Sequence, residues 1–238
     1  MKLFTIGNSF AVNSCKFLPE IFENGGVDFR LGRANLGGCS LETHWNNASS
    51  DAPTYGDVFG GDKSLKDLLW SDKWDVVTIQ QASHFSWLNG TFYPYADNLV
   101  EFIRKYAPQA EICVHETWAY RSDNERLNNE FKITQSQMFA LLKENYLNLA
   151  IKYGFRILPV GEAFACVQKM TGDAIGETTR NPDGPSHANP YGEYIGGLLF
   201  YTALTGKSLD EIAFVPEGIT EEQAIIAKCA VREALSMY

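Results

Sequence analysis

Ser9 and His187 are the residues of this sequence best placed to act as a nucleophile and its base. Ser9 follows a strand-like Leu-Phe-Thr-Ile run, which predicts a strand-to-helix turn with its N–H among the free donors of a helix N-terminus. A serine nucleophile needs a base, and the base needs a partner that fixes its tautomer. His187 and Asp183, four residues apart, supply that pair. A turn serine is also a favoured N-cap, so the nucleophile prediction depends on His187 and Asp183 as well.

The elements that must position these residues are βαβ units, because short β-rich runs alternate with helical patterns along the whole chain. The expected strands are Lys2–Ile6, Val27–Asn35, Asp75–Ile79, Glu111–His115 and Phe155–Pro159. The expected helices are Ser9–Asn24, Leu65–Trp70, Tyr95–Tyr106, Glu125–Lys152, Val160–Met170, Pro190–Leu204 and Glu221–Met237. Residues 49–64 lack periodicity and are expected to form a surface loop or insertion. We therefore expect residues 1–238 to form a single α/β domain around a parallel sheet.

Polar residues follow each expected strand, at the sheet edge where parallel α/β proteins bind ligands. Gly37 and Gly38 follow the second strand, and both are common turn residues; Gly38 is the better candidate for a backbone N–H donor to an oxyanion. Ser83 follows the third strand. Aromatic residues in these loops either pack in the core or stack against a sugar ring; they are Trp45, Trp87, Trp118 and Tyr120.

Three histidines, His44, His84 and His115, fall at or after expected strand ends, beside Glu42 and Glu116. None forms the i, i+4 His pair or H-E-x-x-H pattern of a metal site, so we expect polar or substrate-contacting histidines and no metal. Cys39 adjoins the Gly-Gly turn, but cysteine is usually a small buried hydrophobe, and no His-Asp pair suits it better than Ser9.

The composition of the chain argues against two classes of binding partner, nucleic acids and membranes. The net charge of -9 and a pI near 5.0 argue against nucleic-acid binding. No apolar run reaches the roughly 18 residues of a membrane-spanning helix, so no membrane partner is expected. The N-terminus shows no leader pattern, and the five cysteines are scattered and odd in number, which favours free thiols in the cytoplasm.

The order of four blocks resembles the SGNH (GDSL-like) serine hydrolase superfamily. The blocks are Gly7-Asn8-Ser9, the Gly-Gly loop, the polar stretch after the third strand, and the late Asp183-x-x-x-His187. The match looks closest to a poorly characterised branch that has Gly-Asn-Ser in place of Gly-Asp-Ser and a Trp-Asp-Val-Val-x-x-Gln-x-x-Ser block at 74–83. The resemblance implies a flavodoxin-like three-layer α/β/α sandwich with a five-stranded parallel sheet, a Ser-His-Asp triad and no cofactor.

Two positions depart from the superfamily. Its third block usually supplies an asparagine to the oxyanion hole, whereas this chain has Gln80 and Gln81; we expect Gln80 to take that role, with the N–H groups of Ser9 and Gly38. Its Asp usually lies three residues before the His rather than four, so another carboxylate in place of Asp183 stays open.

These features together predict a serine esterase that hydrolyses an O-acyl ester, with acetyl as the favoured acyl group, on a small molecule or a carbohydrate. His44, Ser83 and Trp118 are the candidate substrate-binding residues. The alternatives are a thioesterase or lipase-like acyl hydrolase with the same machinery, and a non-catalytic carbohydrate-binding module on the same fold. The oligomeric state does not follow from the sequence.

Overall fold

The main sheet has five parallel strands in the order β2-β1-β5-β6-β7. The computed structural model describes residues 1–57, 60–172 and 186–238. The strands are β1 Lys2–Gly7, β2 Arg30–Asn35, β5 Val76–Ile79, β6 Glu111–Glu116 and β7 Arg156–Pro159. Together with the flanking helices this is the predicted three-layer α/β/α fold. Counted along the main sheet, the order is the flavodoxin-like 2-1-3-4-5, which places the switch point between β1 and β5.

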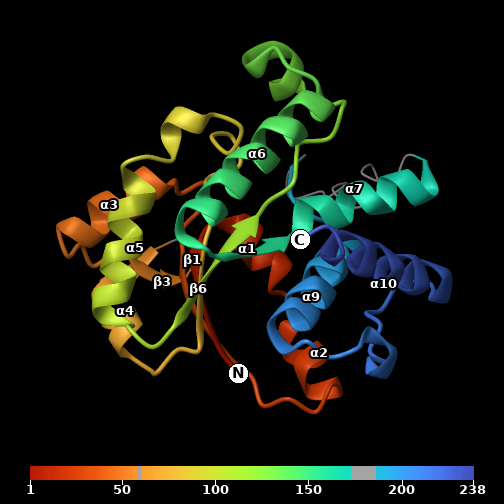
Figure 1. Ribbon diagram of the computed structural model, residues 1–238, viewed down its shortest axis with the longest axis horizontal. Helices are drawn as coiled ribbons and strands as arrows, with labels where there is room; N and C mark the ends of the chain where they lie inside the picture. Colours follow the sequence, from red (N-terminus) through yellow and green to blue (C-terminus); the bar gives the residue numbers. More distant parts are fainter. Residues whose placement is uncertain (58–59, 173–185) are drawn as a thin grey trace. The chain divides into compact units, whose positions relative to one another are not determined.

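The described chain divides into two compact units that interleave along the sequence. Unit 1 comprises Met1–Val12, Phe29–His115 and Leu141–Ile157; unit 2 comprises Asn13–Asp28, Glu116–Ala140 and Leu158–Tyr238. In unit 1, three helices lie side by side (Figure 1): α3 Leu41–Ser49, α4 Leu65–Trp70 and α5 Tyr95–Tyr106. In unit 2, four helices pack on one another: α2 Leu18–Asn24, α7 Val160–Thr171, α9 Pro190–Thr205 and α10 Glu221–Leu235.

Two of the predicted helices are interrupted. The expected helix from Ser9 to Asn24 is two helices, α1 Ser9–Ser14 and α2, because Pro19 lacks an N–H and its ring would clash with the carbonyl of Cys15 in a continuous helix. The expected helix from Glu125 to Lys152 is a short π-helix, η2 Leu127–Phe131, followed by α6 Gln135–Tyr153. Lys132 separates them with a left-handed φ of 58°.

Residues 49–64 contain more structure than the sequence predicts. A two-stranded antiparallel sheet forms from β3 Tyr55–Asp57 and β4 Gly60–Lys63. Just before it lies α3, which is absent from the prediction because it is mostly polar. The sequence does contain the N-cap residue of α3, because the Ser40 side chain accepts a hydrogen bond from the Thr43 N–H.

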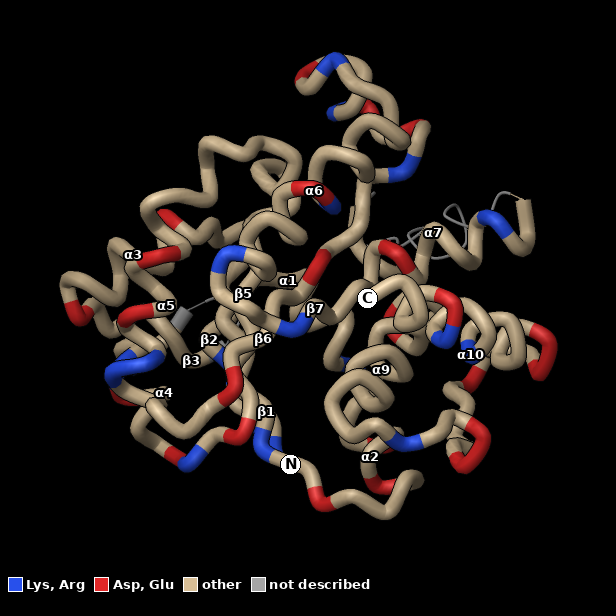
Figure 2. Tube along the Cα trace, in the orientation of Figure 1, with Lys and Arg blue, Asp and Glu red and all other residues tan. Residues whose placement is uncertain are grey.

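Acidic and basic residues are interspersed along both units (Figure 2). No helix of the described residues is long and apolar enough to cross a membrane.

Candidate active site

Ser9 is the first residue of α1, directly after the end of β1, and is half-buried. This is the strand-to-helix turn that the sequence predicts. Because β1 lies between β2 and β5, the turn stands at the switch point of the sheet. The N-terminus of α1 favours negative charge at this position, so an oxyanion that develops beside Ser9 is stabilised there.

Gly38 lies in the turn after β2, where the Cys39 N–H donates to the Leu36 carbonyl at 3.1 Å. Gly38 has a φ of 63°, a conformation that residues with a side chain rarely adopt, and nothing lies within 4 Å of the position of a Cβ there. Gly38 is also exposed, and its N–H has no protein acceptor among the described residues. A backbone donor with this freedom suits the predicted oxyanion role.

Gln80 is not placed as the sequence predicts. It follows β5, but its side chain is 1% exposed and turns under the Gly7-Asn8 segment. Its Nε2 donates to Asn8 Oδ1 at 2.9 Å, and its Oε1 lies 2.7 Å from His115 Nδ1. The carboxamide is therefore committed to the protein interior. Both ends of the amide already have protein partners, so this geometry does not favour donation to an oxyanion, and the oxyanion role of Gln80 stays a prediction.

Gln81 does not replace it. Its Oε1 accepts the N–H groups of Leu41 and Ala82, and its Nε2 donates to the carbonyl and the hydroxyl of Thr91. All the hydrogen-bonding positions of this fully buried amide are thus used to join the start of α3 to the loop after β5.

Asn8 is a candidate functional residue to which the sequence analysis gave no role of its own. Asn8 is 2% exposed; its Oδ1 accepts the Phe10 N–H at 3.0 Å and its Nδ2 donates to the Cys39 carbonyl at 3.2 Å. It therefore connects the loops that carry Ser9 and Gly38. Its position between Gly7 and Ser9 in the first block was a signal that could have identified it.

Burial also decides the role of His44. The ring is fully buried: Nε2 lies 3.0 Å from the Gly7 carbonyl oxygen and Nδ1 lies 2.9 Å from the Tyr55 hydroxyl. The loss of solvent around the ring lowers the pKa of His44 to about 4. His44 is thus a neutral residue that is hydrogen-bonded to the end of β1, and its substrate-binding role stays a prediction that this burial does not favour. Ser83 is half-buried, and its substrate-binding role stays a prediction.

In unit 2, His187 lies in a short segment that is fixed on both sides. Trp118 Nε1 donates to the Ser186 carbonyl at 2.9 Å, and the Asn189 side chain caps α9 by accepting the Gly192 N–H at 2.9 Å. Trp118 is 2% exposed and stacks on Phe164, a placement that favours a structural contact with the histidine segment; its predicted contact with substrate stays a prediction. Tyr120 is buried as well.

Asp183 lies outside the described residues, and its role stays a prediction. Ser9 belongs to unit 1 and His187 to unit 2, so their convergence also stays a prediction.

Two further groups bear on alternative chemistries. Burial raises the pKa of the Cys39 thiol to about 12, so this cysteine is protonated at neutral pH and is a poor nucleophile. Glu116 uses its carboxylate to accept the Glu162 N–H, near the start of α7, and the Tyr238 hydroxyl. Across residues 1–57, 60–172 and 186–238, no group of three or more His, Cys, Asp or Glu side chains is arranged to hold a metal.

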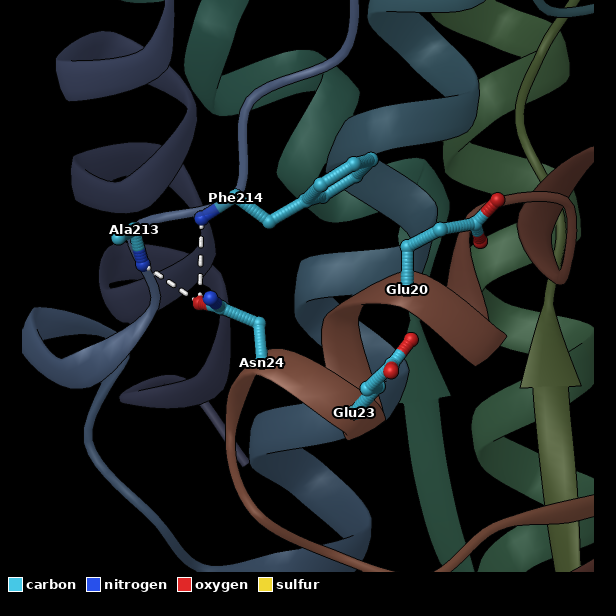
Figure 3. Close-up of a pocket in the computed structure, with 5 residues that line it drawn as sticks. All are labelled: Glu20, Glu23, Asn24, Ala213 and Phe214. Atoms are coloured by element: carbon cyan, nitrogen blue, oxygen red, sulfur yellow. Dashed lines mark hydrogen bonds between the residues drawn. The ribbon is translucent and has the colours of Figure 1, made fainter.

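Two surface pockets occur in unit 2. One, of about 580 Å³, is lined by Glu20, Glu23, Asn24, Ala213 and Phe214 (Figure 3). Asn24 Oδ1 accepts the N–H groups of both Ala213 and Phe214, which ties the end of α2 to this segment. The second, of about 340 Å³, shares Ala213 and is lined mainly by apolar residues. Neither is lined by a predicted site residue, and we assign no chemistry to them.

A family model described as "Domain of unknown function (DUF4886)" matches residues 2–234. The chain belongs to this family. A DUF4886 protein of known structure, from Bacteroides uniformis ATCC 8492, is 27% identical, with a TM-score of 0.87 over 99% of this chain and 95% of that one. No curated protein matches the DUF4886 chain studied here.

More distant solved structures include one described by the SGNH name and one described as an esterase. An SGNH hydrolase structure from Slackia heliotrinireducens is 21% identical, with a TM-score of 0.61 over 87% of this chain and 99% of that one. An acetyl xylan esterase is 12% identical, with a TM-score of 0.62 over 86% of this chain and the whole of the other. At these identities the likeness shows a shared fold. This DUF4886 protein therefore has the SGNH (GDSL-like) hydrolase fold, as the motifs predict.

Gly7 should not tolerate a side chain. A Cβ there would lie 2.9 Å from Cδ and Oε1 of Gln80, so Gly7→Ala must push the buried amide away from Asn8 and His115. We expect a loss of roughly 1 to 3 kcal/mol in the free energy of unfolding, as for other overpacked sites. Denaturant unfolding measures this change. Gly90→Ala is the control, because nothing lies within 4 Å of its Cβ position; equal stability of the two variants would contradict the close contact.

The buried histidines should make the protein sensitive to acid. Burial lowers the pKa of His115 to about 3 and that of His44 to about 4, whereas an unfolded histidine has a pKa of about 6.5. Below pH 6.5 the unfolded chain binds protons that the folded chain does not, so each histidine reduces stability by up to about 1.4 kcal/mol per pH unit as the pH falls toward 4.

Denaturant unfolding between pH 7 and pH 4 checks this expectation. His115→Asn should reduce the slope of unfolding free energy against pH in this range, because one buried titrating group is removed. An unchanged slope would show that His115 titrates normally in the folded protein.

Proposed function

We propose that this protein is a serine esterase in which Ser9 is the nucleophile, His187 the general base and Asp183 the group that orients His187. The observation that carries the proposal is the position of Ser9 as the first residue of α1, at the switch point of a sheet with the SGNH strand order. The proposal requires the Ser9 hydroxyl to come within hydrogen-bond reach of His187 during catalysis.

The proposed reaction has two halves. His187 takes the hydroxyl proton as Ser9 Oγ attacks the ester carbonyl, and then gives that proton to the departing alcohol, which leaves an acyl group on Ser9. A water molecule next loses its proton to His187 and attacks the acyl carbonyl. The acid departs, and Ser9 regains the proton from His187.

The negative oxygen formed in each half is held by backbone donors. We assign this role to the N–H groups of Ser9 and Gly38, because one begins a helix and the other is exposed in a left-handed turn.

The substrate proposed is an acetyl ester of a carbohydrate. One support is the fold that the chain shares with an acetyl xylan esterase. The other is a pair of half-buried tryptophans in unit 1, Trp45 after β2 and Trp87 after β5. A hydrolysis screen of acetylated sugars against short-chain p-nitrophenyl esters and acyl thioesters tests this choice. Faster turnover of thioesters or long-chain esters would favour the thioesterase or lipase-like alternative.

Ser9→Ala should abolish both esterase turnover and covalent labelling by a fluorophosphonate, while the unfolding free energy changes by at most about 1 to 2 kcal/mol. The measurements are kcat for an acetyl ester, mass spectrometry of the labelled protein and thermal unfolding. Ser64→Ala is the matched control, because Ser64 caps α4 and has no proposed catalytic role. If Ser9 has no catalytic role, Ser9→Ala will keep its activity, as Ser64→Ala does.

Trp118→Phe should lower kcat roughly tenfold with little change in KM. The ring would still stack on Phe164, but the Ser186 carbonyl would lose its donor and the His187 segment would be less well positioned. Trp74→Phe is the control, since it also removes a hydrogen bond from a buried indole to a carbonyl, that of Leu68. An equal effect of the two substitutions on kcat would contradict a positioning role for Trp118.

A further inference from the structure

The side-chain amide of Asn8 is held in one orientation by two backbone groups. Its Oδ1 accepts the Phe10 N–H at 3.0 Å, and its Nδ2 lies 3.2 Å from the Cys39 carbonyl oxygen. A backbone N–H can only donate and a carbonyl can only accept, so a flipped amide would place two donors together at one end and two acceptors at the other. Asn8 is buried, and such a mismatch would be costly there. The direction of both hydrogen bonds is therefore fixed.

This direction passes through Gln80 to His115. Asn8 Oδ1 can only accept, so the Gln80 atom 2.9 Å from it must be the amide nitrogen. The Gln80 oxygen then faces His115 Nδ1 at 2.7 Å, and that ring nitrogen must carry the hydrogen. Three side chains from the ends of β1, β5 and β6 thus form a chain in which His115 donates to Gln80 and Gln80 donates to Asn8.

His44, beside the same end of β1, must have the opposite tautomer. Its Nε2 lies 3.0 Å from the Gly7 carbonyl oxygen and must donate to it, so Nδ1 accepts from the Tyr55 hydroxyl. Both histidines are fully buried and resist protonation, so each keeps a single ring hydrogen at neutral pH. His44 is therefore an internal reference for the hydrogen position in His115.

We propose that Asn8, Gln80 and His115 are positioning residues that set the separation of the two oxyanion donors, the N–H groups of Ser9 and Gly38. The inference rests on the proposed function. Asn8 holds the residue after Ser9 with its oxygen and the residue after Gly38 with its nitrogen. Gln80 and His115 keep that amide from rotating. Catalysis is sensitive to the position of such donors at the scale of 1 Å, because a misplaced donor no longer meets the developing charge.

The series of hydrogen bonds from His115 through Gln80 to Asn8 accounts for two departures from the superfamily pattern. An aspartate at position 8, as in Gly-Asp-Ser, has no N–H for the Cys39 carbonyl and would place a second acceptor against it. An asparagine at position 80 is one methylene shorter than Gln80 and would not span the gap between Asn8 and His115. Gly7 completes the set, because Gln80 fills the space that a Cβ at position 7 would need.

The first experiment reads the hydrogen positions without reference to activity. Long-range ¹H–¹⁵N correlation spectra of the full protein labelled at histidine nitrogen, recorded at pH 7, distinguish the two tautomers. The chain has only four histidines, and His115→Asn and His44→Asn variants assign the two buried ones. We expect hydrogen on Nδ1 of His115 and on Nε2 of His44. Hydrogen on Nε2 alone of His115 would overturn the proposed direction of the chain.

The second experiment measures the rate at which a fluorophosphonate labels Ser9. Gln80→Glu, nearly the same size, places an acceptor against Asn8 Oδ1, so we expect the rate to fall roughly ten- to a hundredfold. For an ester substrate, kcat should fall by a similar factor with KM nearly unchanged. Gln137→Glu is the control, because this exposed residue only accepts the Thr134 N–H, which glutamate also does.

A pair of variants at position 115 keeps the inference falsifiable if Gln80→Glu fails to fold. Asparagine places an amide nitrogen near the position of Nδ1, whereas leucine has no donor, so His115→Asn should restore most of the labelling rate that His115→Leu loses. Wild-type rates in both Gln80→Glu and His115→Leu would overturn the positioning role while leaving the proposed function intact. An unreactive wild-type protein would instead overturn the proposed function, and with it any role of these residues in an oxyanion hole.

Discussion

The hydrogen bonds of the Asn8 amide are the contacts on which the candidate site in unit 1 most depends. They tie the turn after β1 to the turn after β2, and neither turn has a regular ladder of its own to hold it. A net contribution of about 1 kcal/mol for each bond understates their importance, because a buried amide that loses its partner costs about 1 to 3 kcal/mol. The geometry of this edge is thus enforced by the penalty for leaving a polar group unpaired.

The same reasoning explains why so many polar side chains are buried at this end of the sheet. Almost no solvent reaches five of these side chains, and each forms a hydrogen bond with a group on another segment; they are Asn8, Gln80, Gln81, His44 and His115. An apolar core at these positions would be more stable but would leave the loops free to shift. Polar networks fix a single arrangement only when every member is satisfied. Histidine fits such a network because, once dehydrated, it stays neutral and offers one donor and one acceptor.

Much of the fold could be predicted from the sequence, because strands and helices each have a characteristic local pattern of apolar residues. Four of the five strands centre on short apolar runs, with β2 Arg30–Asn35 the mixed exception, and Tyr95–Tyr106 has an uninterrupted helical period, so these elements were predicted within a few residues. Pro19 was visible in the sequence and should have divided the first helix. The polar helix α3 was missed because its buried side comprises only Leu41, His44 and Ala48, and one of these is a histidine bonded to another strand.

The site was predictable only in part, for a reason that is also physical. The place of Ser9 follows from strand order, and the left-handed turn at Gly38 follows from glycine itself. The direction in which Gln80 points depends on the space above Gly7 and on a histidine 35 residues further along the chain. The spacing of residues in the sequence does not reveal such a distant contact, so Gln80 was matched by residue type to the asparagine of other sequences, and its bonds to Asn8 and His115 were not predicted.

The absence of a side chain at Gly7 also has an evolutionary consequence. Gln80 occupies the room that glycine leaves, and its amide is useful only between the partners that Asn8 and His115 provide. A change at Asn8, Gln80 or His115 alone leaves a buried polar group of its neighbours unpaired, and a side chain at Gly7 crowds the Gln80 amide. We therefore expect these four positions to change together rather than singly in related sequences.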